Sequence, residues 1–147
     1  KSSEVLLTIG EIDCRLDSGI IKHKNKFPEK EIEEIIVTTV ENYLTYIVKI
    51  NSAYQHNIII QGIPCPNIDT GTCSEKEVTQ LIEVIKKLNC ELKNKSKKKG
   101  FEFLDVHKLT DRGDGFSNAI WHIDSIHLSP EGFLEAWSRY ASKQKCV

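Results

Sequence analysis

The segment NIIIQGI, residues 57–63, lies between two long stretches of helical periodicity, and this order decides the fold class. Its continuous apolar centre is typical of a strand that is buried on both faces. The proline-rich residues 64–66 that follow cannot continue a ladder, because proline has no N–H to donate. Apolar residues recur at three- and four-residue steps through residues 29–53 before this segment and 78–92 after it, which predicts a helix on each side.

The alternation continues outward in both directions. Residues 4–9, EVLLTI, and residues 101–106, FEFLDV, are short apolar runs that we interpret as two further buried strands. Ser74 and Glu77 have the spacing of a capping box, so the second helix should start there and fray within the lysine-rich residues 93–100. This alternation of strands and helices predicts an α/β fold with a parallel sheet and right-handed crossovers.

Length and composition describe a soluble globular domain over residues 1–147. The chain is 39% hydrophobic and 28% charged with a net charge of −1, so it has no basic character that would indicate a nucleic-acid partner. It has no apolar run long enough to cross a membrane and no signal peptide, which makes the cytoplasm the expected location. Its five scattered cysteines are expected to be reduced thiols. Because the chain lacks Met and begins with Lys1, we expect further sequence upstream.

The segment WHIDSIHLSPEGFLEAW, residues 121–137, carries the strongest functional signal. Ser129 is a favoured N-cap and Pro130 suits the first helical position, so a last helix should begin there. Asp124 lies three residues before His127, and both lie just outside that helix. A carboxylate that fixes one imidazole nitrogen is how a protein orients a general base. The segment therefore predicts an oriented base.

Polar residues follow each predicted strand. They lie at residues 10–15, at 64–67 and from 105 into the segment of Asp124 and His127, whereas residues 16–28 lack a period and are expected to form an exposed loop. Because the carboxyl ends of parallel strands meet at one edge of a sheet, these polar groups should converge there.

The block Asp124-Ser125-Ile126-His127-Leu128-Ser129 resembles the D-x-x-H-L segment before the final helix of the SGNH, or GDSL-type, hydrolases. That resemblance implies a flavodoxin-like three-layer α/β sandwich, of which this chain would be the C-terminal strands and helices. It also implies an esterase or other acyl hydrolase, with His127 as the base and Asp124 orienting it.

A second block, Gly10-Glu11-Ile12-Asp13, is similar to the G-x-N-D block of that family. Ile12 stands where the family has an Asn that donates to the oxyanion. GEIDCR is similar to a variant of this block in a subset of relatives, so Gly10, Glu11, Asp13 and Arg15 are candidate substrate-binding residues. The alternative for the charged residues is a buried ion-pair network, with Arg15 bound to Asp13 or Asp17.

The family's nucleophilic Ser belongs to a G-D-S block, which does not occur in these residues. We therefore expect the Ser in an upstream segment, and we expect the uncovered edge of the strand at residues 4–9 to pair with that segment or with another chain. The resemblance implies hydrolysis or transfer of an acyl group, on an acetylated carbohydrate or small ester, without a cofactor or metal. The alternative is an inactive binding or assembly module. A metal site of His122, Asp124 and His127 is a further alternative, although their spacing is not a common zinc pattern.

Overall fold

Three parallel strands form the central layer of the structure, a computed structural model that describes residues 3–144. The strands are β1 (Glu4–Thr8), β2 (Asn57–Gln61) and β3 (Glu102–Leu104), in the spatial order β1-β2-β3. In the register, Glu4 lies opposite Asn57 and Ile59 opposite Glu102. The predicted α/β fold with a parallel sheet is confirmed.

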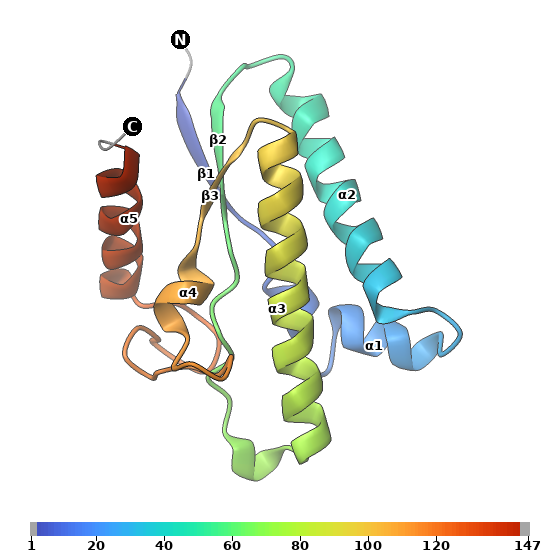
Figure 1. Ribbon diagram of the computed structural model, residues 1–147. Coiled ribbons are helices and arrows are strands. Elements are labelled where there is room, and N and C mark those ends of the chain that lie inside the picture. Colours follow the sequence, from blue (N-terminus) through green and yellow to red (C-terminus); the bar gives the residue numbers. More distant parts are fainter. Residues whose placement is uncertain (1–2, 145–147) are drawn as a thin grey trace.

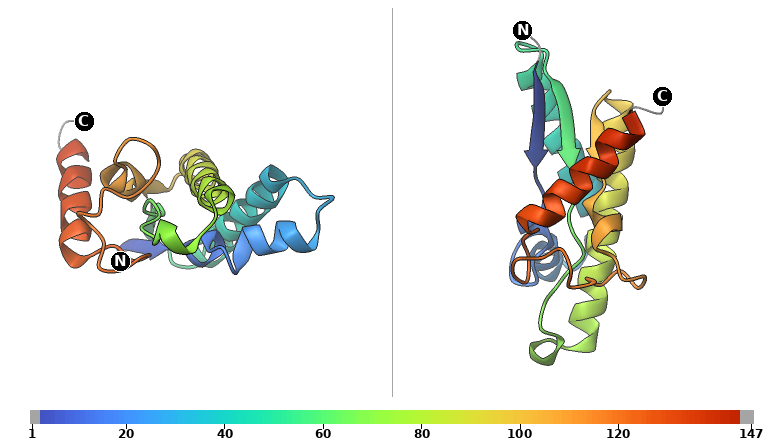
Figure 2. Two further views of the ribbon diagram at one scale, coloured as in Figure 1. Left: turned by 90° about the horizontal axis from the view of Figure 1, so that it is seen from below. Right: turned by 90° about the vertical axis from the view of Figure 1, so that its left-hand side faces the viewer.

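Helices cover both faces of this sheet (Figures 1 and 2). The helices α1 (Gly19–Lys26), α2 (Ile32–Asn51) and α3 (Glu75–Lys98) lie on one face. The short α4 (Val106–Thr110) and the last helix α5 (Pro130–Gln144) lie on the other. Two single 3₁₀ turns, η1 (Ile12–Cys14) and η2 (Thr70–Thr72), complete the described elements. The arrangement is a three-layer α/β sandwich, as the resemblance implied.

Alternation along β2 divides the core in two. Ile58 and Ile60 pack against α2 and α3, whereas Ile59 packs against α4 and α5. Successive side chains of a strand point to opposite faces, so a strand between two helical layers must be apolar at every position. Burying each such isoleucine stabilises the fold by about 1.5–3 kcal/mol. This is why the NIII run lies at the centre of the sheet.

Residues 16–28 do not form the predicted exposed loop. They contain α1, in which Ile20 and Ile21 are only 2% and 3% exposed. Two adjacent apolar residues are too few to define a helical period, so the sequence pattern does not predict this helix. Gly19 starts this helix with φ of +62° and lies against the backbone of Asp13. A Cβ added at Gly19 would lie 2.4 Å from the Cα of Asp13, so the position requires glycine.

The third strand is shorter than predicted, and the second helix is longer. β3 ends at Leu104 because the Asp105 side chain accepts a hydrogen bond from the Lys108 N–H and starts α4, so the predicted strand position Val106 is helical. The lysine-rich residues 93–98 remain in α3. Lys95 and Lys99 near its C-terminal end both bind Glu41 of α2. The predicted capping box at the start of α3 is present.

Cys14, Cys65, Cys73 and Cys90 are free thiols, as predicted, while Cys146 lies outside the described residues. No helix within residues 3–144 is long and apolar enough to cross a membrane.

Candidate functional site

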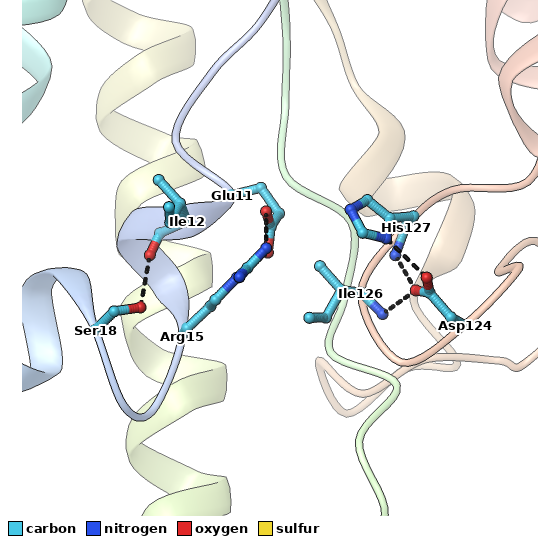
Figure 3. Close-up of polar contacts among 7 residues, drawn as sticks. All are labelled: Glu11, Ile12, Arg15, Ser18, Asp124, Ile126 and His127. Atoms are coloured by element: carbon cyan, nitrogen blue, oxygen red, sulfur yellow. Dashed lines mark hydrogen bonds and ion pairs between the residues drawn. The ribbon is translucent and has the colours of Figure 1, made fainter.

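Asp124 and His127 form a closed local unit in the loop before α5. The Asp124 carboxylate accepts hydrogen bonds through Oδ1 from the N–H groups of Ile126, at 2.7 Å, and His127, at 2.6 Å. Its other oxygen, Oδ2, lies 2.7 Å from Nδ1 of the His127 ring (Figure 3). Ser129 then caps α5, its hydroxyl accepting from the Gly132 N–H at 3.0 Å. The predicted contact and the predicted helix start are both present.

The electrostatics of this unit determine which nitrogen of His127 is free. The N–H of His127 holds the pKa of the Asp124 carboxyl far below its usual range, and the His127 ring and the N–H of Ile126 add to this effect. An ionised carboxylate only accepts hydrogen bonds, so Nδ1 of the neutral ring must carry the proton. The lone pair is then on Nε2, to which no group within residues 3–144 hydrogen-bonds. That is the tautomer a general base requires.

The loop after β2 holds the Asp124–His127 unit in place. Asn67 donates through Nδ2 to the Asp124 carbonyl at 3.0 Å. His122 lies 2.9 Å from the Ser117 hydroxyl through Nδ1 and 3.0 Å from the Cys65 carbonyl through Nε2. Since both ring nitrogens of His122 are in hydrogen bonds, this residue is part of the support and does not join the proposed alternative metal site with Asp124.

Glu11 and Arg15 form a bidentate ion pair at the carboxyl end of β1. The Arg15 Nε and Nη2 atoms each lie 2.9 Å from a Glu11 carboxylate oxygen. The predicted partners of Arg15, Asp13 and Asp17, are therefore wrong: residues four apart on the η1 turn place Glu11 within reach. The pair is partly exposed, and the hydrogen bond to Glu11 raises the pKa of the guanidinium.

Gly10 and Asp13 are not brought to the same surface as Glu11. Asp13 accepts a hydrogen bond from the Tyr43 hydroxyl of α2, which directs it into the helical layer. That carboxylate and, to a greater extent, burial raise the pKa of Tyr43. Gly10 is buried with φ of +90°, and an added Cβ would lie 3.2 Å from Cδ1 of Ile63. Its role is to let the chain turn beneath the site.

Two hollows that share lining residues lie at this edge of the sheet. One, of about 380 Å³, is lined by Glu11 and His127, with residues 61–64 between them. The other, of about 260 Å³, is lined by Glu11, Arg15 and Ile126. Figure 3 shows the Glu11–Arg15 pair on one side of the chain that leaves β2 and the Asp124–His127 unit on the other. The predicted convergence of polar groups is present for these four residues.

The supporting contacts of two residues were not predicted from the sequence. Asn67 and Asn89 both bind the backbone of loops at the site, and Asn89 does so from the buried face of α3. For Asn89 a signal existed, because it lies four residues after Ile85 on the otherwise apolar stripe of the helix. Asn67 lies within the predicted polar residues 64–67, but its contact has no sequence signal, because it depends on the folding of the distant Asp124 loop.

The fold is shared with solved structures of GDSL-like hydrolases. A GDSL-like lipase from Bacteroides thetaiotaomicron matches 97% of this chain and 62% of its own, with a TM-score of 0.63 and 14% identity. A protein assigned as an acylhydrolase from Bacteroides fragilis matches 96% of this chain and 60% of its own, with a TM-score of 0.63 and 17% identity. For phospholipase A1 from Streptomyces albidoflavus the coverages are 93% and 68%, the TM-score 0.53 and the identity 18%.

No protein-family model matches the sequence, and a search of curated proteins finds no significant match. The identities with the solved structures are low, so the likeness is one of fold. The chain has the α/β fold of the SGNH or GDSL-type hydrolases and spans about 60% of the length of the first two structures. The catalytic and substrate-binding roles of its site residues remain predictions.

Proposed function

We propose that this chain supplies the oriented base of a GDSL-type ester hydrolase or acyl-transfer enzyme. The observation that carries the proposal is the Asp124–His127 unit, which leaves Nε2 of His127 free beside a hollow at the carboxyl ends of parallel strands. A serine hydroxyl is a weak nucleophile and needs such a base within hydrogen-bond reach. In this reaction Nε2 takes the serine proton as the hydroxyl attacks the ester carbonyl, and returns it to the leaving alcohol.

The nucleophilic Ser would come from a segment that pairs with the free edge of β1. Within residues 3–144, β1 is hydrogen-bonded to β2 alone, so its other edge is open to a further strand. Beside that edge lies an apolar hollow of about 350 Å³. Its lining includes Leu7 of β1, Tyr46 of α2 and Tyr54 of the turn after α2, and both tyrosines are largely exposed. A strand carrying the Ser would cover this surface and end next to His127.

The substrate is proposed to be a small acyl ester, such as an acetylated carbohydrate. Hollows of about 380 and 260 Å³ are near the lower limit of ligand sites, about 300–1,000 Å³, which favours a short acyl group. The Glu11–Arg15 pair at the rim offers both hydrogen-bond acceptors and donors for a sugar hydroxyl.

Labelling of the full-length protein with a fluorophosphonate probe tests this function. We expect one Ser, located by peptide mapping, to be labelled, and His127→Ala to abolish labelling. His23→Ala is the control, since His23 lies in α1 and lines neither hollow at the Asp124–His127 unit. Hydrolysis should be faster for p-nitrophenyl acetate than for long-chain esters.

Ile12 favours a second candidate, a binding or assembly module without chemistry. It stands at the position of the family's oxyanion donor and offers no side-chain donor, and its side chain is 59% exposed. Absence of both labelling and ester hydrolysis in the full-length protein would reject the enzyme and favour this module.

A further inference from the structure

A cluster of three potential metal ligands lies next to the candidate site, and one of them, Cys65, also lines the smaller hollow. Cys65 follows β2, while His107 and Asp111 lie four residues apart on one face of α4 and its end. The ligand atoms of the three side chains all lie within 4.8 Å of one another. They supply sulfur, nitrogen and oxygen, which are the three kinds of ligand that zinc accepts.

Two of the three side chains have a ligand atom without a hydrogen-bond partner among the described residues, whereas the Cys65 thiol donates to the His107 carbonyl at 3.5 Å. Nε2 of His107 is buried and has no hydrogen-bond partner among the described residues. A buried polar atom without a partner costs about 1–3 kcal/mol, so such an atom needs an explanation. The Asp111 carboxylate uses Oδ1 to accept from the N–H groups of Gly113, at 2.7 Å, and Gly115, at 2.8 Å. Its Oδ2 has no hydrogen-bond donor within residues 3–144.

A cysteine, a histidine and an aspartate could also form a thiol nucleophile with its base. The environment of Cys65 argues against this. The residue is 1% exposed, so an ester could not reach its sulfur. Burial also raises the pKa of the thiol to about 12, whereas reactive cysteines have a lowered pKa. A metal ion is small enough to occupy a site that a substrate cannot enter.

We propose that Cys65, His107 and Asp111 bind a zinc ion, with a water molecule as the fourth ligand. Bonds of about 2.0 Å to nitrogen and oxygen and about 2.3 Å to sulfur place tetrahedral ligands about 3–4 Å apart. Because the ligand atoms lie within 4.8 Å of one another, the side chains need to close by at most about 1–2 Å. On binding, the Cys65 thiol releases its proton to solvent and coordinates as the thiolate, and no electron is transferred.

This ion would have a structural role at the sheet edge. It would join the loop after β2 to α4, and the carbonyl of Cys65 is the group that His122 binds. Through His122 and Asn67 the same loop holds the segment of the Asp124–His127 unit. The proposal stands independently of ester hydrolysis, since it concerns metal binding and the stability of this loop.

The test uses untagged full-length protein that has been stripped with a chelator. With one equivalent of Co²⁺ in place of Zn²⁺ we expect a thiolate-to-cobalt charge-transfer band and tetrahedral d–d absorption. Zn²⁺ should displace the Co²⁺ and raise the melting temperature. Absence of the charge-transfer band, or Co²⁺ absorption of octahedral type alone, would overturn the proposal.

Variants then assign the ligands. Loss of a residue that hydrogen-bonds a metal ligand typically weakens metal binding by about 10–100-fold. Cys65 is proposed as a ligand itself, so Cys65→Ser should weaken Zn²⁺ binding by at least about 100-fold. Cys90→Ser is the matched control, because Cys90 is exposed on α3. Asp111→Asn should also weaken Zn²⁺ binding. Its amide oxygen can still accept from the N–H groups of Gly113 and Gly115, so the loop they form is kept. This variant therefore tests the site even if Cys65→Ser fails to fold. Unchanged affinity in Asp111→Asn would overturn the assignment.

Discussion

The side-chain amide of Asn89 in α3 hydrogen-bonds both backbone groups of Ile63, accepting from its N–H at 2.8 Å and donating to its carbonyl at 2.9 Å. Asn89 thus takes the place of a neighbouring strand at the point where β2 has ended. The contact lies beneath the hollow that His127 lines, because Ile63 is part of the same lining. A buried amide therefore sets the position of the floor of the candidate site.

Asn89→Ala should lower the free energy of unfolding by about 2–4 kcal/mol. The truncation leaves the N–H and the carbonyl of Ile63 buried without partners, at about 1–3 kcal/mol each. Urea unfolding followed by circular dichroism measures the change. Asn94→Ala on the exposed face of α3 is the control, and a loss for Asn89→Ala no larger than that of the control would contradict the argument.

Gly62→Ala should destabilise the protein by about 1–3 kcal/mol through overpacking. An added Cβ would lie 2.7 Å from Oδ1 of Asn89 and 2.9 Å from Cζ of Phe103. Asn89→Ala removes one of these obstacles. The double variant should therefore lose less free energy of unfolding than the two single variants lose in sum. Simple additivity in a double-mutant cycle would show that the two residues do not compete for this space.

Asp124→Asn should reduce kcat in the full-length enzyme by about 10²–10⁴-fold with a smaller change in KM. Asparagine keeps an oxygen for the N–H groups of Ile126 and His127, but its amide would donate to Nδ1 and place the ring proton on Nε2. The base would then have the wrong tautomer. Steady-state kinetics on a small acetyl ester give the values, and an unchanged kcat would exclude Asp124 as the orienting residue.

Glu41 should make a pH-dependent contribution to stability. Hydrogen bonds from Lys99 and Lys95 lower the pKa of its carboxyl from 4.5 to about 2. The folded-state pKa is depressed, so this contribution is complete above about pH 4.5 and is lost as the pH falls toward about 2. The difference in melting temperature between wild type and Glu41→Gln should therefore shrink over that window. A difference that stays constant with pH would refute this linkage.

Short sequence motifs predicted the features of this structure that depend on neighbouring residues. The Ser129 cap, the Ser74 capping box and the three-residue spacing of Asp124 and His127 each depend on neighbours within one helical turn. The carboxyl-end convergence followed from sheet topology alone.

What could not be predicted depends on packing between distant segments. Arg15 could reach any of three nearby carboxylates, and the η1 turn selects Glu11. Nothing in the sequence places His107 beside Cys65, because α4 has to replace the end of a predicted strand before the two side chains meet.

The hydrogen bond from Asn67 to the Asp124 carbonyl joins residues 57 positions apart, whereas Asp124 and His127 are only three apart. Closing such a long loop costs entropy that is recovered only after the sheet has formed. The carboxylate–imidazole contact can therefore form early, in a short unfolded stretch, while its location is acquired late in folding. In amide hydrogen exchange the loop of residues 117–128 would then open before the sheet does. In that open state Asp124 and His127 can remain paired, but the pair no longer lies at the sheet edge.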